Sequence, residues 1–305
     1  MSTLIGIDVG ASHTEAALSD ESLQPCVRVT GPGAALAADN LGSSAKAVGD
    51  IVSQLLQRQE GTRTPDAVVV GAAGAGSQEI RTGFATLLAA ELGGELALEV
   101  TTDGIIALHD AFGHGPGIVI CAGSGSIAYA RDPAGCVWRV GGLGWQYGDQ
   151  GSGYALGRAA LDAVTQAANG SGPSTVLTVS VDSAAGSESA AAMAQSGDLP
   201  HRAAVAGIAR TVCEAARAGD AVACALVRAA ATELARQIEA LVDRFAEPLR
   251  PVGLAFSGRL LSCDSPVRHE LLTIVRERIT AVRCAEGEVD PAWGAVALAA
   301  ELLQR

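Results

Sequence analysis

The chain has 305 residues, which is enough for two domains of ordinary size. Hydrophobic residues make up 49% and charged residues 18%, which excludes a chain disordered throughout, and the formal net charge of −12 argues against nucleic acid or an anionic membrane as a partner. The first apolar run meets a carboxylate at Asp8, and no segment approaches ~20 uninterrupted apolar residues, so we expect a cytoplasmic protein without a signal peptide or membrane span.

Seven cysteines are scattered along the chain without a Cys-x-x-Cys pair. They are Cys26, Cys121, Cys136, Cys213, Cys224, Cys263 and Cys284. This spacing predicts reduced thiols, most of them buried as small apolar side chains, and it does not favour a disulfide framework or a zinc site.

Hydrophobic periodicity predicts alternating strands and helices in the first 113 residues. An apolar strand over 4–7 leads through a glycine- and serine-containing turn to a returning strand over 14–18. The elements expected next are a helix over 45–59, a strand over 67–71, a helix over 80–92, a strand over 96–100 and a helix over 105–112.

A second unit begins with a buried strand over 117–122, which turns at 123–126 and returns over 127–130. Because this repeats the strand, Gly/Ser turn and strand of the first segment, it predicts two α/β halves related by a weak internal duplication. Helices are expected over 154–168, 203–217, 221–245 and 267–278, a strand over 252–256, and a last helix from 290, whereas 169–200 gives no clear pattern. Gly219 and Asp220 are expected to cap the two helices that flank them.

Each of the two hairpin turns has a tip of small residues. Such a tip leaves backbone N–H groups uncovered, and these can bind phosphate oxygens. In the first hairpin Ser12 and Thr14 add hydroxyl groups, and Asp8 at the end of the preceding strand is placed to hold Mg²⁺. An ordinary hairpin with a polar tip is the alternative for either one, but two matched tips favour phosphate binding more than one does.

The order of these segments resembles the hexokinase, actin and heat-shock-protein ATPase superfamily. Within it, the chain is most similar to the family of N-acetylglucosamine kinase, glucosamine kinase and the BadF/BadG/BcrA/BcrD-type ATPases. Residues 8–14 and 123–126 resemble its two phosphate motifs, 253–258 its adenosine motif, and 148–153 the signature of its amino-sugar kinases. Ala11, Ser12 and Ser257 depart from the family's usual glycine, threonine and glycine, so we expect weaker nucleotide contacts there.

The resemblance implies an α/β fold with two ribonuclease-H-like (actin-like ATPase) domains around a central cleft. The first domain is expected to cover 1–113, completed by a C-terminal helix over 290–305, and the second 114–289.

The resemblance also implies a site. Asp103 matches the catalytic aspartate of the family, which would take the proton from the substrate hydroxyl, although its context in Thr-Thr-Asp-Gly equally predicts a helix cap. Asp8 would organise Mg²⁺. The expected contacts to ATP are Gly10, Ala11, Ser12, Thr14, Ser124, Gly125, Ser126, Ser257 and Gly258. The expected contacts to the substrate are Asn40, Gly74, Ala75, Asp103, Asp149 and Ser152.

The expected reaction transfers the γ-phosphoryl group of ATP, with Mg²⁺, to the 6-hydroxyl of N-acetylglucosamine or a close relative. Glucosamine or N-acetylmuramic acid stays open as the substrate, since one sequence does not show what surrounds C2 of the sugar. A non-kinase ATPase that activates a redox partner is the other alternative. The partner expected is therefore a small amino sugar, with neither nucleic acid nor membrane, and a homodimer stays open.

Overall fold

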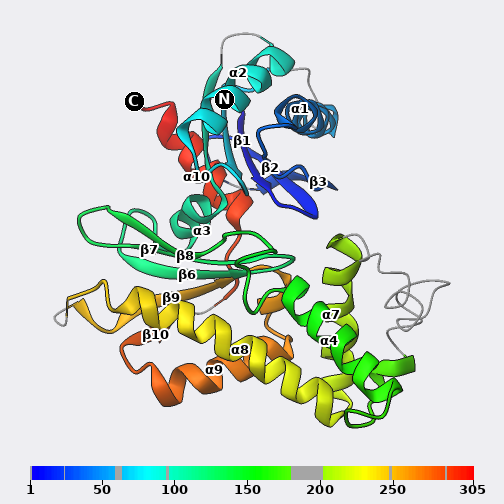
Figure 1. Cartoon of the computed structure of the whole chain (residues 1–305). Coiled ribbons are helices and arrows are strands. Elements are labelled where there is room, and N and C mark those ends of the chain that lie inside the picture. Colours follow the sequence, from blue (N-terminus) through cyan, green and yellow to red (C-terminus); the bar gives the residue numbers. More distant parts are fainter. Residues whose placement is uncertain are drawn as a thin grey trace. The chain divides into compact units, whose positions relative to one another are not determined.

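Each half of the chain folds around its own β-sheet (Figure 1). The computed structural model describes residues 2–23, 25–58, 64–93, 96–179, 202–246, 249–285 and 287–305. Two compact units result, one from Met1–Gly115 with Val289–Arg305 and the other from Pro116–Glu288. The end of the chain thus returns to the unit in which the chain begins.

The sheet of the first unit places three parallel strands side by side. Its strands are β1 (Leu4–Val9), β2 (His13–Ser19), β3 (Pro25–Pro32), β4 (Ala67–Ala72) and β5 (Ala97–Thr102), in the order β3-β2-β1-β4-β5. The first three are antiparallel neighbours, whereas β1, β4 and β5 run parallel. Since Val9 pairs with Ala72 and Ala72 with Thr102, the segments that follow these three strands leave the sheet at one edge.

Helices cover both faces of this sheet. One face packs against α1 (Leu41–Arg58) and α2 (Gln78–Leu92), and the other against α3 (Asp103–Phe112) and α10 (Pro291–Leu302). Helix α10 approaches β1 closely because Gly6 has no side chain: a Cβ there would lie 2.3 Å from the carbonyl oxygen of Ala292. This contact fixes the C-terminal helix on the first unit.

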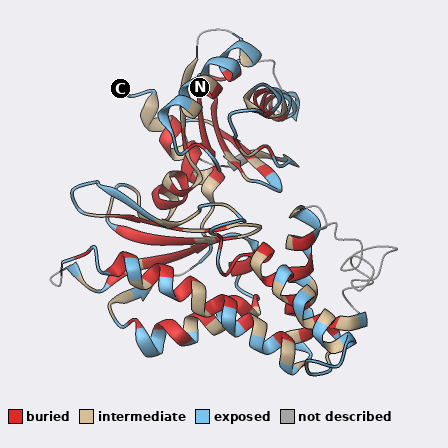
Figure 2. Cartoon of the chain, viewed as in Figure 1, coloured by how far each residue is buried: buried red, intermediate tan, exposed pale blue. Residues whose placement is uncertain are grey.

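The sheet of the second unit repeats the topology of the first. Its strands are β6 (Gly117–Ala122), β7 (Ser126–Arg131), β8 (Val137–Gly141), β9 (Val252–Ser257) and β10 (Val282–Cys284), in the order β10-β9-β6-β7-β8. Again three antiparallel strands are followed by two parallel ones, as an internal duplication predicts. Strand β6 is buried along most of its length, whereas β8 is an exposed edge (Figure 2).

One hydrophobic core joins this sheet to its helices. The helices are α4 (Gly153–Ala168), α7 (Arg202–Arg217), α8 (Ala221–Val242) and α9 (Pro266–Arg278), with a short 3-10 turn, η2 (Arg259–Leu261), after β9. Gly219 has φ of 88°, and the Asp220 side chain accepts a hydrogen bond from the Ala223 N–H, so both predicted caps are confirmed.

Several sequence predictions need correction. Strands β3, β8 and β10 were not expected, and α8 ends at Val242 instead of continuing to residue 245. The prediction that most cysteines are buried is wrong for Cys136, Cys224 and Cys263, whose positions lie in turns or on outward helix faces. Of the segment 169–200, residues from 180 onward lie outside the described residues. Every helix in the described part of the chain is too short or too polar to span a membrane.

Candidate functional site

Two aspartates lie at the shared edge of the three parallel strands in the first unit. Asp8 is the second-to-last residue of β1, and Asp103 directly follows β5 as the first residue of α3. Burial, as the largest cause, and the negative charges of Asp103, Glu15 and Asp290 together raise the pKa of Asp8 to about 8. A carboxyl group in such surroundings is poised to bind a cation, because a dication would offset the repulsion among these acids.

Arg28 from β3 holds two members of this acidic cluster. Its Nη1 is 2.7 Å from Oε1 of Glu15, and its two Nη atoms pair with the carboxylate of Asp290. Asp290 also caps α10 by accepting from the Trp293 N–H, and its own N–H donates to Asp110. The start of α10 is therefore tied to β3 through one guanidinium group.

The tip of the first hairpin is exposed, but the residue that follows it is not. Ala11 and Ser12 are exposed, and the Gly10 N–H donates to the His13 carbonyl oxygen at 3.0 Å. Thr14 is fully buried, and its hydroxyl donates to the Pro32 carbonyl oxygen at 2.9 Å. The hydroxyl of Thr14 thus already has a partner within the sheet, whereas the tip itself faces solvent.

The residues predicted to contact the sugar in this unit lie on two neighbouring loops. The Leu36 N–H donates to the Ala73 carbonyl oxygen, which joins the two loops. They approach so closely that a Cβ at Gly74, which has φ of 88°, would lie 2.0 Å from the Leu36 carbonyl oxygen. Ala75 beside it is fully buried. Asn40 uses its amide inside its own loop, where Oδ1 accepts from the Ala37 N–H at 2.8 Å and Nδ2 donates to a carbonyl oxygen.

Asp103 is the first residue of α3 and Thr102 is its N-cap residue, so the prediction that Asp103 caps this helix is wrong. Oδ1 of Asp103 accepts a hydrogen bond from the Gly104 N–H at 2.9 Å, so it contributes to the start of α3. The side chain is half-buried at the carboxyl end of β5, next to the charge of Asp8. One carboxylate has two oxygens, so a hydrogen bond to the helix does not prevent the other oxygen from accepting a proton.

In the second unit, Asp149 lies against the second hairpin tip. A Cβ at Gly125 would be 2.9 Å from Oδ2 of Asp149. The same Oδ2 is 3.5 Å from Nη2 of Arg202. Burial raises the pKa of Asp149, while Arg202 and the backbone N–H groups of Ser126 and Gly144 oppose this rise. Asp149 is buried and has φ of 59°, a left-handed conformation that is uncommon outside glycine.

The segment 148–153 is joined to the same hairpin by backbone hydrogen bonds. The N–H groups of Gly153 and Tyr154 donate to the carbonyl oxygens of Gly123 and Ser124 at 2.8 and 3.2 Å. The hydroxyl of Ser126, which is buried, donates to the carbonyl oxygen of Gln150 at 2.7 Å. The predicted phosphate motif and the predicted sugar motif therefore form one interlocked structure in this unit.

Ser152 is the N-cap of α4. Its side chain is fully buried and accepts from the Ala155 N–H at 3.2 Å. The structure thus gives this predicted substrate contact a helix-capping position, and Asp149 does not cap α4.

Ser257 is the last residue of β9 and Gly258 follows it, beside the end of β6. Cys121 pairs with Ser257, and Gly258 has φ of 93°, where a Cβ would lie 2.5 Å from the Ala122 carbonyl oxygen. Because β6 and β9 are parallel, the second hairpin and the predicted adenosine motif leave the sheet at the same edge. This repeats the arrangement of Asp8 and Asp103 in the first unit.

Sequence reasoning missed the charged residues around Asp8 and Asp149. Arg28, Glu15 and Asp290 meet only after folding, and the unpredicted strand β3 carries the arginine. Arg202 likewise reaches Asp149 from a distant helix. The sequence does show an arginine at position 28 and an Asp-Pro pair at 290–291 that is typical of a helix start, but neither feature indicates which residue it will contact.

Comparisons with known proteins agree with this fold. The chain is 27% identical over 310 residues to an N-acetylmuramic acid/N-acetylglucosamine kinase from Clostridium acetobutylicum, covering 98% of both chains. Its fold matches a candidate N-acetylglucosamine kinase from Chromobacterium violaceum with a TM-score of 0.80 and 28% identity, over 98% of this chain and 99% of the other. A ROK-family glucokinase from Streptomyces griseus, solved with glucose and AMPPNP, has the same fold at 19% identity, with a TM-score of 0.66 and coverage of 98% and 100%. The model of the BadF/BadG/BcrA/BcrD ATPase family matches residues 5–299, so the chain belongs to that family.

Proposed function

We propose that the protein is an ATP-dependent kinase that phosphorylates the 6-hydroxyl of an amino sugar, N-acetylglucosamine or a close relative. The observation that carries this proposal is the pair of carboxylates, Asp8 and Asp103, at the shared edge of three parallel strands beside a hairpin with an exposed tip. Family membership and the kinase names of two similar proteins support it. N-acetylmuramic acid, which one of those proteins is named for, is the nearest alternative substrate.

The residues around Asp8 fit a hard dication. Carboxylates are the ligands that Mg²⁺ prefers, and the pKa of Asp8 is raised first by burial and then by three neighbouring negative charges, which Mg²⁺ would offset. We propose Asp8 as the residue that holds Mg²⁺, with Asp103, Glu15 and Asp290 contributing to the attractive field. When bound, Mg²⁺ would offset the charge of the ATP phosphates.

Asp103 is proposed to act on the acceptor hydroxyl. Phosphoryl transfer leaves the protein mainly the work of positioning and charge stabilisation, and a carboxylate hydrogen-bonded to the attacking hydroxyl orients it and accepts its proton. One Asp103 oxygen is held by the Gly104 N–H, which fixes the direction of the side chain.

The remaining contacts follow the loops described above. We propose that the hairpin tips, Ala11 and Ser12 in the first unit and Ser124 and Gly125 in the second, donate to nucleotide phosphate, with Ser257 and Gly258 at the nucleoside. Asn40, Gly74 and Asp149 are proposed to bind the sugar. The side chains of Thr14, Ser126 and Ser152 are buried and already hydrogen-bonded, so we expect their effects to be indirect, through the loops they stabilise.

A substrate panel tests the proposal. Purified protein is mixed with Mg·ATP and each of N-acetylglucosamine, glucosamine, N-acetylmuramic acid and glucose, and ADP release is followed by a coupled assay while NMR locates the phosphate on the sugar. We expect ADP release that depends on an amino sugar and a product phosphorylated at O6. ATP hydrolysis that no sugar stimulates would contradict the kinase proposal and support the ATPase alternative.

A further inference from the structure

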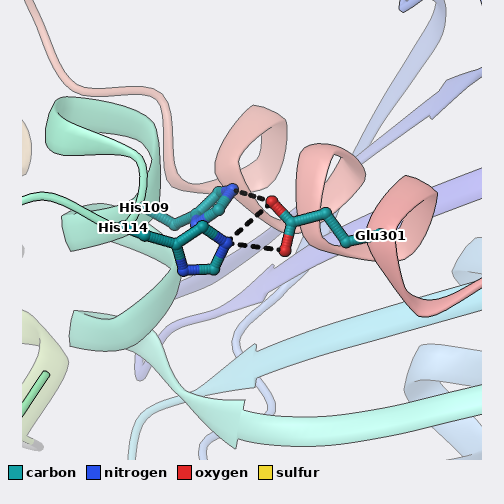
Figure 3. Close-up of side chains that lie close together, drawn as sticks. All are labelled: His109, His114 and Glu301. Atoms are coloured by element: carbon teal, nitrogen blue, oxygen red, sulfur yellow. Dashed lines mark hydrogen bonds and ion pairs between the residues drawn. The ribbon is translucent and has the colours of Figure 1, made fainter. Parts of the chain in front are cut away.

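Two histidines and a glutamate in the first unit direct their ligand atoms toward one point (Figure 3). His109 is in the last turn of α3, His114 follows that helix, and Glu301 is near the end of α10. Nε2 of His109 is 3.3 Å from Oε1 of Glu301, and Nε2 of His114 is 3.0 Å from Oε1 and 2.9 Å from Oε2. All three ligand atoms lie within 4.8 Å of one another.

The turn that ends α3 brings the two imidazoles together. Gly113 has φ of 57°, which a residue with a side chain rarely adopts, and its N–H donates to the His109 carbonyl oxygen at 2.8 Å. The chain therefore reverses at once, and the ring centroids of His109 and His114 lie 4.9 Å apart in an edge-on arrangement.

The donor set matches a transition metal better than it matches Mg²⁺. Zinc–nitrogen bonds of ~2.0–2.1 Å in a tetrahedral site separate neighbouring ligand atoms by about 3.3 Å. The contacts of 2.9–3.3 Å between each imidazole Nε2 and the Glu301 carboxylate are close to this value, and all ligand atoms lie within 4.8 Å of one another, so a metal ion would require only a modest rearrangement. Imidazole nitrogens suit zinc, nickel or copper, whereas Mg²⁺ prefers oxygen and would not compete.

The surroundings also favour a cation. Glu301 and His109 lie at the C-terminal ends of two helices, where the helix dipole is negative. The His109 side chain is 6% exposed and so is held in place, whereas that of His114 is 71% exposed and leaves the site open to solvent. A rigid ligand and an accessible one together give a metal ion both a defined position and a path of entry.

We propose that His109, His114 and Glu301 form a binding site for a first-row transition-metal dication, with zinc as the best match. Three protein ligands leave one tetrahedral position for water. The ion ties the end of α3 to the end of α10, the two helices that begin next to Asp103 and Asp290. Its role is to stabilise these helices, and it is separate from the Mg²⁺ proposed at Asp8.

Metal titration of the full chain tests this proposal. Protein stripped with a chelator is titrated with Zn²⁺ in excess Mg²⁺ by calorimetry, and with Co²⁺ by visible absorption. The variant His114→Ala removes an exposed ligand, so its fold is preserved, and His269→Ala removes an exposed histidine of the second unit as the matched control. We expect one zinc per chain in the wild type and the control. Affinity should fall by at least about 100-fold in His114→Ala, since even the loss of an outer partner costs ~10–100-fold.

A second measurement separates a metal site from a simple hydrogen-bonded cluster. Zinc should raise the unfolding temperature of the wild type and of His269→Ala, but not of Glu301→Gln, whose amide keeps the shape of the carboxylate without its charge. Equal zinc binding by wild type and His114→Ala would place the ion elsewhere and overturn the proposal. No zinc or cobalt binding by the wild type would show that the three side chains only hydrogen-bond to one another.

Discussion

At the scale of single residues, the aspartates of the candidate site differ in how far the sequence could predict them. Asp8 and Asp103 follow apolar strands, and parallel strands bring such positions together, so their common edge was predictable. The ion pair between Arg28 and Asp290 beside Asp8 was not predictable, because these two residues are 262 positions apart and only the folded chain pairs them. Asp149 was predicted as a sugar ligand, but its burial against Gly125 and its positive φ could not be read from the sequence.

Asp149→Asn should make the protein more stable and less active. Asparagine suits the left-handed conformation at φ of 59°, and it removes the cost of burying a charge. Because the folded-state pKa of Asp149 is raised, the native state binds its proton more tightly than the unfolded state, so this residue's contribution to stability falls as pH rises above about 4. The gain in unfolding temperature over wild type should therefore be largest at neutral pH and shrink toward pH ~4.

Thermal unfolding of both proteins across this pH range, with sugar-dependent turnover at neutral pH, provides the check. Asp149→Ala serves as the control, because it lacks the polar group and strains the same backbone, and it should be less stable than Asp149→Asn. A gain in unfolding temperature that grows as pH falls would contradict the proposed effect of burial.

At the scale of secondary structure, strongly periodic and capped elements were predictable and edge strands were not. The caps at Gly219 and Asp220 act locally, so neighbouring residues suffice to identify them. Strand β8 is exposed and β3 contains Pro25, Gly31 and Pro32, so neither shows a buried apolar run, and each forms only by pairing with a neighbouring strand.

The crossing of α3 and α10 depends on a helical glycine. A Cβ at Gly294 would lie 2.1 Å from the Ile106 carbonyl oxygen and 2.9 Å from the Asp110 backbone nitrogen. Because both are backbone atoms of α3, they cannot move aside as the end of a flexible side chain could. We expect Gly294→Ala to destabilise the protein by about 1–3 kcal/mol through overpacking. Gly207→Ala in α7 is the matched control, since a Cβ there meets nothing within 4 Å.

Denaturant unfolding of the two alanine variants tests this contact. The control should be unchanged or more stable by about 0.5–1 kcal/mol, the usual gain from replacing glycine inside a helix. Equal stability of the Gly294→Ala and Gly207→Ala variants would show that α10 can move away from α3 without cost.

At the scale of the whole molecule, the chain contains two units that share one sheet topology and belongs to the BadF/BadG/BcrA/BcrD ATPase family. The order of segments and the two hairpins made this fold predictable, because each hairpin begins its own sheet. The return of residues 289–305 to the first unit depends on close contacts at Gly6 and Gly294, which hydrophobic patterning does not reveal.

Deleting residues 290–305 should unfold the first unit and spare the second. Helix α10 supplies Ala292, Ala295, Val296, Leu298 and Ala299 to the core beneath the first sheet, whereas the second unit has a core of its own. Hydrogen exchange of the truncated chain should show lost protection in β1 and β4 and retained protection in β6 and α8. Retained protection of β1 would mean that the first unit does not need its C-terminal helix.

The most direct test of the proposed mechanism is the turnover of Asp103→Asn. Asparagine has nearly the same shape as aspartate and keeps an oxygen for the Gly104 N–H, but its amide cannot take the proton. We predict unchanged unfolding temperature and ATP affinity, with sugar-dependent kcat reduced by ~10²–10⁴-fold. Full sugar-dependent turnover in this variant would show that Asp103 only supports the start of α3 and that the base lies elsewhere.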